Sequence, residues 1–297
     1  MQTKVNVRKV LLYVGLVWLL SFAGLRAYLA LGGTWSILPA SLYMFMPLAV
    51  TLLVQVAIYR ESALVPFWVN IRLNRWFLLA AIIPVALLLL SIGFSTLIPG
   101  TILSYSTDDI LRRSADLYSP EELVLMRQQM EALPVHPFWT SLVGGILAGF
   151  SINALFAFGE EFGWRGFMLK ELMPMGFWKC SAITGVVWGI WHAPAILQGH
   201  NYPENPAAGV FMMVLLSVLM SPVLSYVCLK ANSVVAAAAM HGVINGVAGI
   251  PIMVLEGGSR FTTGMTGLAG MLALLLVNLA IARFGGVPNL ERKFFNT

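Results

Sequence analysis

Charged side chains are scarce in this sequence of 297 residues: Asp, Glu, Lys and Arg together make up 10% of it. In a typical soluble domain about a quarter of the residues are charged and about half are apolar, whereas 59% of this chain is hydrophobic. The mean hydropathy of +0.82 agrees with this imbalance. The composition excludes an ordinary soluble globular protein and indicates a membrane protein.

Cysteine is also rare, with Cys180 and Cys228 the two in the chain. Their number and spacing exclude a disulfide scaffold and a cysteine-based metal site, and we expect both thiols to be reduced. The net charge is +5, but the basic residues form no patch interleaved with aromatic side chains. We therefore expect no nucleic-acid partner.

Long apolar runs are abundant. Several approach or exceed the roughly 18–20 residues that cross a bilayer as a helix, and their continuous apolar character favours helices over a barrel. The sequence predicts an all-α polytopic membrane protein with about eight transmembrane helices, at 10–31, 37–58, 77–98, 138–159, 181–198, 208–229, 234–255 and 263–283. The first run continues past Ala23 to about Leu31, which favours an uncleaved span over a signal peptide. No internal repeat is apparent, so we treat residues 1–297 as a single integral membrane domain.

Basic residues orient these spans. They precede the first span and follow in the even-numbered connections and the tail: Lys4, Arg8 and Lys9, then Arg60, Arg72 and Arg75, then Lys170 and Lys179, then Lys230, and finally Arg292 and Lys293. Because basic residues concentrate in cytoplasmic loops, both termini are predicted to be cytoplasmic. The compact chain favours the cell membrane of a prokaryote.

The connection at 99–137 is long and is predicted to lie outside the membrane. Ser119, Pro120 and Glu122 form the pattern of a capping box at the start of a short helix, and apolar residues from Leu123 to Leu133 fall near one face of it. This helix could lie on the membrane surface or on neighbouring spans, which we favour, or it could act as a lid over a cavity.

A few strongly polar side chains interrupt the apolar runs. They are Glu160, Glu161 and Arg165 at the end of the fourth span, His192 in the fifth, and His241 and Asn245 in the seventh. Counted at 1.5 Å per residue from the nearest basic residue, Glu160, His192 and His241 lie at similar depths of roughly 15, 20 and 17 Å. Ionisable groups inside a membrane are costly and mark functional sites. We therefore predict one site buried between spans 4, 5 and 7.

Helical phase separates the two glutamates. Glu161 and Arg165 are four residues apart and are predicted to form an ion pair on one helix face. Glu160 points about 100° away, which leaves its carboxylate free to face a cavity. His241 and Asn245 are also four residues apart and share a face. Glycines at four-residue spacing around these motifs would let the helices approach closely.

Three motifs follow one another on separate predicted spans: Glu160-Glu161-x-x-x-Arg165, Trp188-x-x-x-His192 and His241-x-x-x-Asn245. They resemble the motifs of the CPBP family, whose members are type II CAAX prenyl endopeptidases and bacteriocin-processing or bacteriocin-immunity proteins. The resemblance covers about residues 138–255. The family's second motif usually begins with Phe, and Trp188 keeps an aromatic ring at that position.

The resemblance implies an intramembrane peptidase of the glutamate type, with an active site that opens to the cytoplasmic side. Glu160 and His192 would activate a water, and His241 with Asn245 would stabilise the oxyanion. The supporting residues would be Glu161, Arg165 and Trp188. The implied partners are the lipid bilayer and a peptide or protein substrate, with prenylated proteins and leader peptides as candidates, and no cofactor is implied.

Three other functions stay open. Glu160, His192 and His241 have the donor chemistry of a zinc peptidase, two histidines and a carboxylate, although no His-Glu-x-x-His motif is present. The same groups could form the proton relay of a coupled transporter, for which an inverted repeat would be expected. The third is a family member that acts as an immunity protein without turnover.

Overall fold

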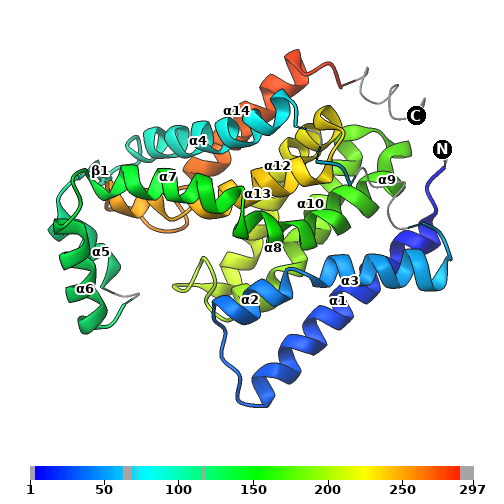
Figure 1. The fold of residues 1–297 in the computed structure, drawn as a ribbon, viewed down its shortest axis with the longest axis horizontal. Helices are drawn as coiled ribbons and strands as arrows, with labels where there is room; N and C mark the ends of the chain where they lie inside the picture. The colour runs from blue at the N-terminus through cyan, green and yellow to red at the C-terminus, as the bar shows by residue number, and fades with distance from the viewer. Residues whose placement is uncertain (1–3, 63–68, 72, 116–117, 288–297) are drawn as a thin grey trace.

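The computed structural model describes residues 4–62, 69–71, 73–115 and 118–287, and the regular secondary structure of these residues is almost entirely helical (Figure 1). Its α-helices are α1 (Val7–Ala30), α2 (Ile37–Tyr43), α3 (Met46–Leu52), α4 (Arg75–Ser95), α5 (Thr107–Ser114), α6 (Pro120–Glu131), α7 (Pro137–Gly149), α8 (Ile152–Glu161), α9 (Leu169–Leu172), α10 (Phe177–Trp191), α11 (Ala193–Ile196), α12 (Pro206–Ala231), α13 (Val234–Val247) and α14 (Leu268–Phe284). The remaining elements are the π-helical segments η1 (Leu53–Ile58) and η3 (Phe162–Met168), the 3-10 turns η4 (Met173–Met175) and η5 (Ile250–Met253), and the antiparallel strands β1 (Ile102–Leu103) and β2 (Leu255–Glu256). Arg72, Arg292 and Lys293, on which part of the orientation rests, lie outside the described residues.

Within the described residues, five helical stretches are long and apolar enough to cross a membrane: Val7–Ala30, Ile37–Ile58, Arg75–Ser95, Pro206–Ala231 and Val234–Met253. The bent pair of α7 and α8 makes a sixth if it is counted as one span. The prediction of an all-α polytopic membrane protein is confirmed, but the predicted eight spans exceed the number found. The two others fall on α10 and α14, which have 15 and 17 residues.

Local sequence explains why these two helices are short. α10 ends at Trp191 and α11 starts anew with Pro194 in its first turn. Proline lacks the N–H that would continue the helix and disfavours helical backbone in the residue before it. α14 begins only at Leu268 because the preceding loop contains Gly257, Gly258 and Gly264 at positive φ, a conformation that a right-handed helix does not contain.

The fourth predicted span, 138–159, is not one straight helix. α7 and α8 meet at a 51° bend, where Ser151 has a non-helical backbone (φ −125°, ψ −102°). The Ser151 hydroxyl donates to the Leu147 carbonyl at 2.7 Å and so competes with the regular backbone bond. After the bend the chain stays helical to Met175. Glu160 and Arg165 therefore lie inside a helical stretch and not at its end.

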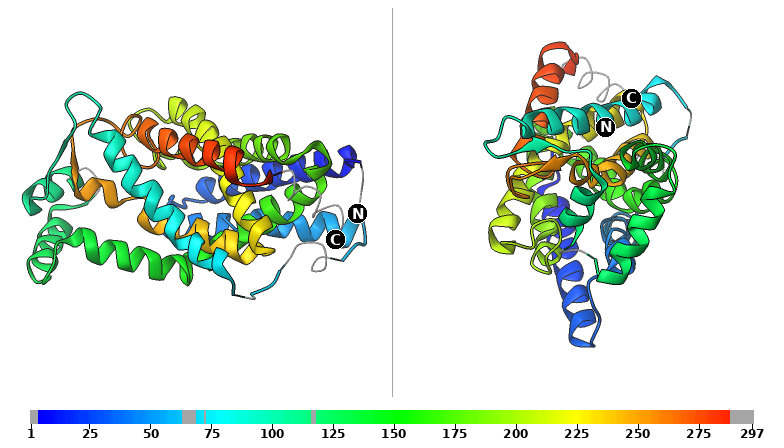
Figure 2. Two further views of the ribbon diagram at one scale, coloured as in Figure 1. Left: turned by 90° about the horizontal axis from the view of Figure 1, so that it is seen from above. Right: turned by 90° about the vertical axis from the view of Figure 1, so that its left-hand side faces the viewer.

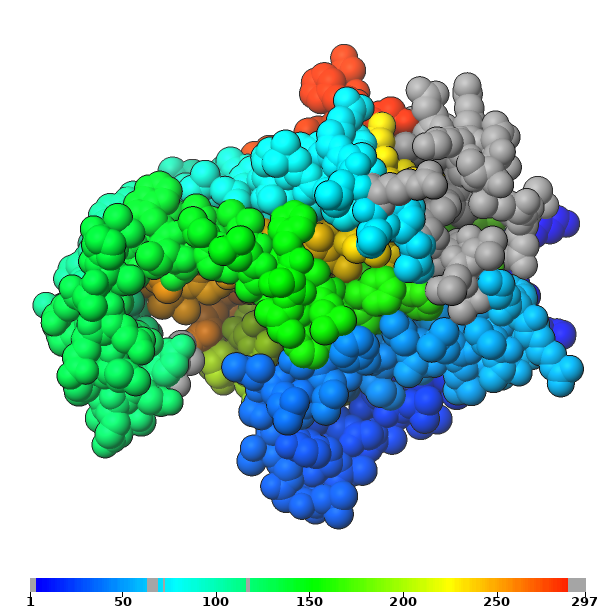
Figure 3. Space-filling view, viewed as in Figure 1, coloured from blue at the N-terminus to red at the C-terminus, as the bar shows by residue number. Residues whose placement is uncertain are grey.

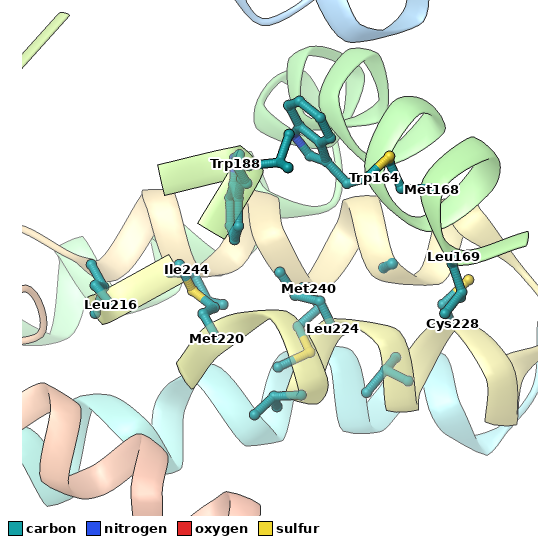
Figure 4. Packing of buried hydrophobic residues seen from close by; sticks show 14 of the residues in the cluster. Trp164, Met168, Leu169, Trp188, Leu216, Met220, Leu224, Cys228, Met240 and Ile244 are labelled. Carbon is teal, nitrogen blue, oxygen red and sulfur yellow. The ribbon is translucent and has the colours of Figure 1, made fainter. Parts of the chain in front are cut away.

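Helix α13 lies at the centre of the bundle, in contact with α4, α7, α8 and α12. It approaches α7 backbone to backbone, because a Cβ on Gly145 would lie 2.5 Å from the carbonyl oxygen of Gly246. Small residues at four-residue spacing permit this approach, and here they pair Gly145 and Gly149 of α7 with the Gly242–Gly246 turn of α13. On the other side, α12 contributes a row of core side chains, Leu216, Met220, Leu224 and Cys228 (Figure 4).

The 99–137 connection forms an arm at one end of the molecule, visible in Figure 1 and in Figure 3. α5 packs on η5, α6 packs on α5, and β1 pairs with β2. An ion pair between Arg112 of α5 and Glu256 of β2 holds α5 beside this two-stranded sheet. The capping box of Ser119 and Glu122 is present as predicted. No residue of α6 is buried, so this helix packs on α5 at the surface and does not close over the interior.

The opposite end of the molecule contains an ion-pair network that the sequence does not indicate. The Lys9 ammonium lies 3.0 Å from Glu171 and 2.8 Å from Glu61, and Lys170 lies 3.5 and 3.6 Å from the same two carboxylates. Lys9 and Glu171 are fully buried. Lys9 therefore fastens the start of α1 to α9. Figure 2 (left) shows these two segments at one end and the α5–α6 arm at the other.

Candidate active site

Glu160 is held by two tryptophans. Its Oε2 accepts a hydrogen bond from the indole Nε1 of Trp188 at 2.6 Å and a longer one from the Nε1 of Trp164 at 3.4 Å. The two indoles come from α10 and from η3, one turn after Glu160 itself, and Figure 4 shows them close together at one side of the core. Glu160 is 2% exposed and lines a cavity. No hydrogen bond to its Oε1 is found among the described residues, so this oxygen can accept a proton from a molecule in the cavity.

Glu161 takes part in a different set of contacts. Its Oε1 lies 3.0 Å from Nη1 of Arg165 and 2.9 Å from Nδ1 of His241, and both Glu161 and Arg165 are fully buried. The predicted ion pair with Arg165 is confirmed. The contact with His241 was not predicted, because it joins residues 80 positions apart. The Arg165 guanidinium also lies over the Trp188 ring, 4.7 Å from its centroid.

The two glutamates lie just before a π-helical segment. Glu161 is the last residue of α8, and η3 then continues as a π-helix from Phe162 to Met168. Such short π-helical insertions occur frequently at functional sites. Every residue of η3 is buried, and Gly163 fits against Pro47 and the Tyr13 hydroxyl, where no Cβ has room. This tightly packed segment thus brings Trp164 into contact with Glu160 and Arg165 into contact with Glu161.

His192 follows the last residue of α10. Its Nδ1 lies 2.9 Å from the Trp188 carbonyl oxygen. Because a carbonyl only accepts, Nδ1 carries the proton and Nε2 is left as an acceptor. The His192 ring also packs edge-on against Trp191 at 5.0 Å between centroids. Both contacts fix the orientation of an imidazole that lines the cavity.

His241 and Asn245 occupy successive turns of α13. His241 is 4% exposed, and its ring packs edge-on against Trp188 at 5.4 Å between centroids. Since Glu161 accepts from its Nδ1, the other nitrogen is the one available to a ligand. Asn245 is exposed and lines the cavity one turn beyond His241.

The cavity that joins these residues has a volume of about 400 Å³. Glu160, His192, His241 and Asn245 all line it, as does Trp188. Glu161 and Arg165 are absent from its lining, in agreement with the helical phases. The remaining wall is largely apolar and includes Met44, Leu87, Met213, Leu216, Met220 and Ile244.

Sequence reasoning missed three of the site's residues. Trp164 lies four residues after Glu160, and this spacing could have identified it as a donor to that carboxylate. Trp35 and His200 line the cavity from two loops and contact each other edge-on at 6.2 Å. No spacing links these two residues, which are brought together by packing of the α1–α2 and α11–α12 connections.

The described residues contain no group of three or more His, Cys, Asp and Glu side chains positioned to hold a metal ion. The zinc set considered from the sequence, Glu160 with His192 and His241, is therefore not assembled in this conformation.

Comparison with known proteins covers this same part of the chain. Residues 134–247 match the family model described as type II CAAX prenyl endopeptidase Rce1-like. A curated protein of Methanococcus maripaludis named CAAX prenyl protease 2 is 32% identical over 92 residues, which are 29% of this chain and 34% of that relative. The chain thus matches about a third of the length of this relative. All seven motif residues, from Glu160 to Asn245, lie within the segment matched by the family model, which supports the resemblance expected from the three motifs.

Proposed function

We propose that this protein is an intramembrane endopeptidase that hydrolyses a peptide bond with a water activated by Glu160 and His192. One observation carries the proposal: a carboxylate from α8, an imidazole at the end of α10, and an imidazole and an amide from α13 line one cavity. The family match supports the same activity. This arrangement supplies both a base and donors for a developing oxyanion without a covalent nucleophile.

The proposed reaction starts with a water between Glu160 and His192. Oε1 of Glu160 removes one proton as the water oxygen attacks the scissile carbonyl carbon, while Nε2 of His192 accepts a hydrogen bond from the other proton. The resulting tetrahedral intermediate carries a negative oxygen. Its collapse breaks the C–N bond, and the proton held by Glu160 passes to the leaving amine. The products are a carboxylic acid and an amine, and transfer of the acid's proton to the amine gives a carboxylate and an ammonium group.

His241 and Asn245 are proposed to stabilise the negative oxygen of this intermediate. The Asn245 amide is a donor in any state, and His241 donates from Nε2 when the imidazole is doubly protonated. The Glu161 carboxylate at 2.9 Å from Nδ1 stabilises that charged form. Glu161 is thus a positioning residue that acts through His241, and Arg165 holds Glu161 in place.

Substitution of Glu160 tests the activity. Glu160→Gln keeps the size of the side chain and its contacts with the two indoles, but removes the base. We expect loss of cleavage with normal membrane insertion, and Glu121→Gln at the exposed surface of α6 should retain wild-type activity. Full activity of Glu160→Gln would overturn the assignment. Comparison of the peptide termini in cells that carry the wild type or Glu160→Gln would identify substrates.

The substrate is proposed to be a peptide or protein segment in or at the membrane, with prenylated proteins as one class. Support comes from the apolar wall of the cavity and from the name of the relative, CAAX prenyl protease 2. A matched pair of peptides with and without a prenyl group tests this point. Preferential cleavage of the prenylated peptide is expected, and equal rates would exclude recognition of the lipid.

We further propose that the end of the molecule with Lys9 and Lys170 faces the cytoplasm, in the cell membrane of a prokaryote. The positive-inside rule supports the orientation. The organism of the relative, Methanococcus maripaludis, supports the prokaryotic membrane. With this orientation, the start of α1 and the end of α14 both lie on the cytoplasmic side.

A further inference from the structure

The cavity reaches the surface at the end of the molecule that carries the α5–α6 arm. Three connections at this end contribute to its wall: Trp35 and Ile37 after α1, His200 and Asn201 after α11, and Met265 and Thr266 before α14. Ile37 is 86% exposed, so the cavity is open beside α2. Figure 3 shows a hollow between the arm and α2 in this region.

Toward the other end the site is closed by packed side chains. Trp164, Phe167 and Met168 are fully buried directly beyond Glu160, followed by the ion pair of Lys9 with Glu171. None of the described residues that line the cavity comes from the connections at this end. A substrate therefore reaches Glu160 from the side of Trp35 and His200.

The two ends also differ in charge: basic side chains predominate at the closed end and acidic side chains at the open end. At the closed end the described residues include nine basic and two acidic side chains: Lys4, Arg8, Lys9, Arg60, Arg75, Lys170, Lys179, Lys230 and Arg283 against Glu61 and Glu171. At the open end they include five basic and seven acidic side chains: Arg26, Arg112, Arg113, Arg127 and Arg260 against Asp108, Asp109, Glu121, Glu122, Glu131, Glu204 and Glu256. By the positive-inside rule the closed end is cytoplasmic, and the open end faces the other side.

We infer that the site takes its substrate from the extracytoplasmic side of the membrane, as an apolar peptide segment of an exported or membrane-anchored protein. This inference rests on the proposed peptidase function and names the side and chemistry of its substrate. The wall that such a segment would meet is lined by Met44, Met213, Met220 and Met265, and methionines adapt to varied apolar side chains. Cytoplasmic termini and a cytoplasmic opening, both expected above, are incompatible in this structure.

Thiol labelling in intact cells tests the side of the opening without any need for activity. The native Cys180 and Cys228 are fully buried, so they provide a low background. Gln198→Cys places an exposed thiol in the loop before His200, and Lys179→Cys places one at the closed end, both outside the cavity lining. We expect a membrane-impermeant maleimide to label Gln198→Cys in intact cells and to label Lys179→Cys only after permeabilisation. Failure to label Gln198→Cys in intact cells, or labelling of Lys179→Cys in them, would overturn the inference.

The substrate side is tested separately by mapping peptide termini that depend on Glu160. Cells with the wild-type protein should contain termini, absent in Glu160→Gln, that map to extracytoplasmic segments of exported or membrane proteins. Termini that map to cytoplasmic segments would overturn the inference and leave the peptidase function standing. If no terminus depends on Glu160, both the proposed peptidase function and the proposed substrate are contradicted. The labelling result still decides on which side of the membrane the cavity opens.

Discussion

The indole Nε1 of Trp188 lies 2.6 Å from Oε2 of Glu160, although 28 residues separate them in the chain. The family to which the three motifs are similar usually has Phe at this position, which cannot donate this hydrogen bond. In this protein Trp188 thus fixes the carboxylate that we propose as the base, while its ring also lies under the Arg165 guanidinium.

Trp188→Phe should keep the fold and lower the turnover rate. A hydrogen bond to a charged group contributes about 1.5–3 kcal/mol, and about 1.4 kcal/mol corresponds to a factor of ten. We expect kcat for a cleaved peptide to fall about tenfold or more with little change in KM. Trp191→Phe is a matched control in the same helix, because its indole donates to Ser21 and not to Glu160. Equal effects of the two substitutions would contradict a specific role of Trp188.

Glu161→Gln should destabilise the protein and also lower the rate of peptide cleavage. The substitution leaves the buried Arg165 without its carboxylate, and the loss of one partner of a buried pair costs about 3–5 kcal/mol. Unfolding in detergent would measure the change. The double variant Glu161→Leu/Arg165→Met leaves no lone buried charge and should lose less stability than the two single variants together. Arg127→Gln in the exposed arm, which breaks a surface pair, should change stability by less than about 1 kcal/mol.

Adjacent glycines of α7 provide a test of helix packing. A Cβ on Gly145 would lie 2.5 Å from the Gly246 carbonyl oxygen, whereas a Cβ on Gly144 meets nothing within 4 Å. Gly145→Ala should therefore push α7 away from α13, with a loss of about 1–3 kcal/mol and reduced activity, because α13 carries His241 and Asn245. Gly144→Ala should be neutral or slightly stabilising. A comparable loss in both variants would show that the close approach is unimportant.

The Lys9 network should make stability depend on acid pH. Partial burial raises the pKa of the Glu61 carboxyl, but the hydrogen bond and charge of Lys9 and the charge of Lys170 outweigh this effect and hold the pKa below its usual value of 4.5. The stabilisation from Glu61 is therefore complete above pH 4.5 and is lost as the pH falls through the lower pKa of the folded protein. Thermal unfolding at several pH values should show this loss, and Glu61→Gln should reduce it. An unchanged acid profile in Glu61→Gln would assign the dependence to other groups.

Chelators should leave the activity unchanged. The proposed reaction uses Glu160 and His192 directly on water, and the described residues contain no group of three or more His, Cys, Asp and Glu side chains positioned to hold a metal ion. Peptide cleavage after treatment with 1,10-phenanthroline and removal of bound metal would measure this. Loss of cleavage that added zinc restores would replace the proposed mechanism by that of a zinc peptidase.

Features that depend on residues close together in the chain could be predicted without a structure. Apolar run length placed the helices within a few residues at 37–58 and 208–229, and an interval of four residues identified the Glu161–Arg165 pair. The same helical phase directed Glu160 to the cavity. Each of these features follows from the length and the 3.6-residue periodicity of a single α-helix, so predicting them requires no knowledge of how helices pack.

Tertiary structure alone decided which distant groups meet. The contacts of Glu160 with Trp188 and of Glu161 with His241 depend on how α8, α10 and α13 pack. The bend at Ser151 is invisible to hydropathy, because the apolar run continues across it. The side on which the cavity opens was also beyond the sequence. It depends on three connections that converge near Trp35 and His200, whereas the charge pattern of the sequence predicts only which end of each helix faces the cytoplasm.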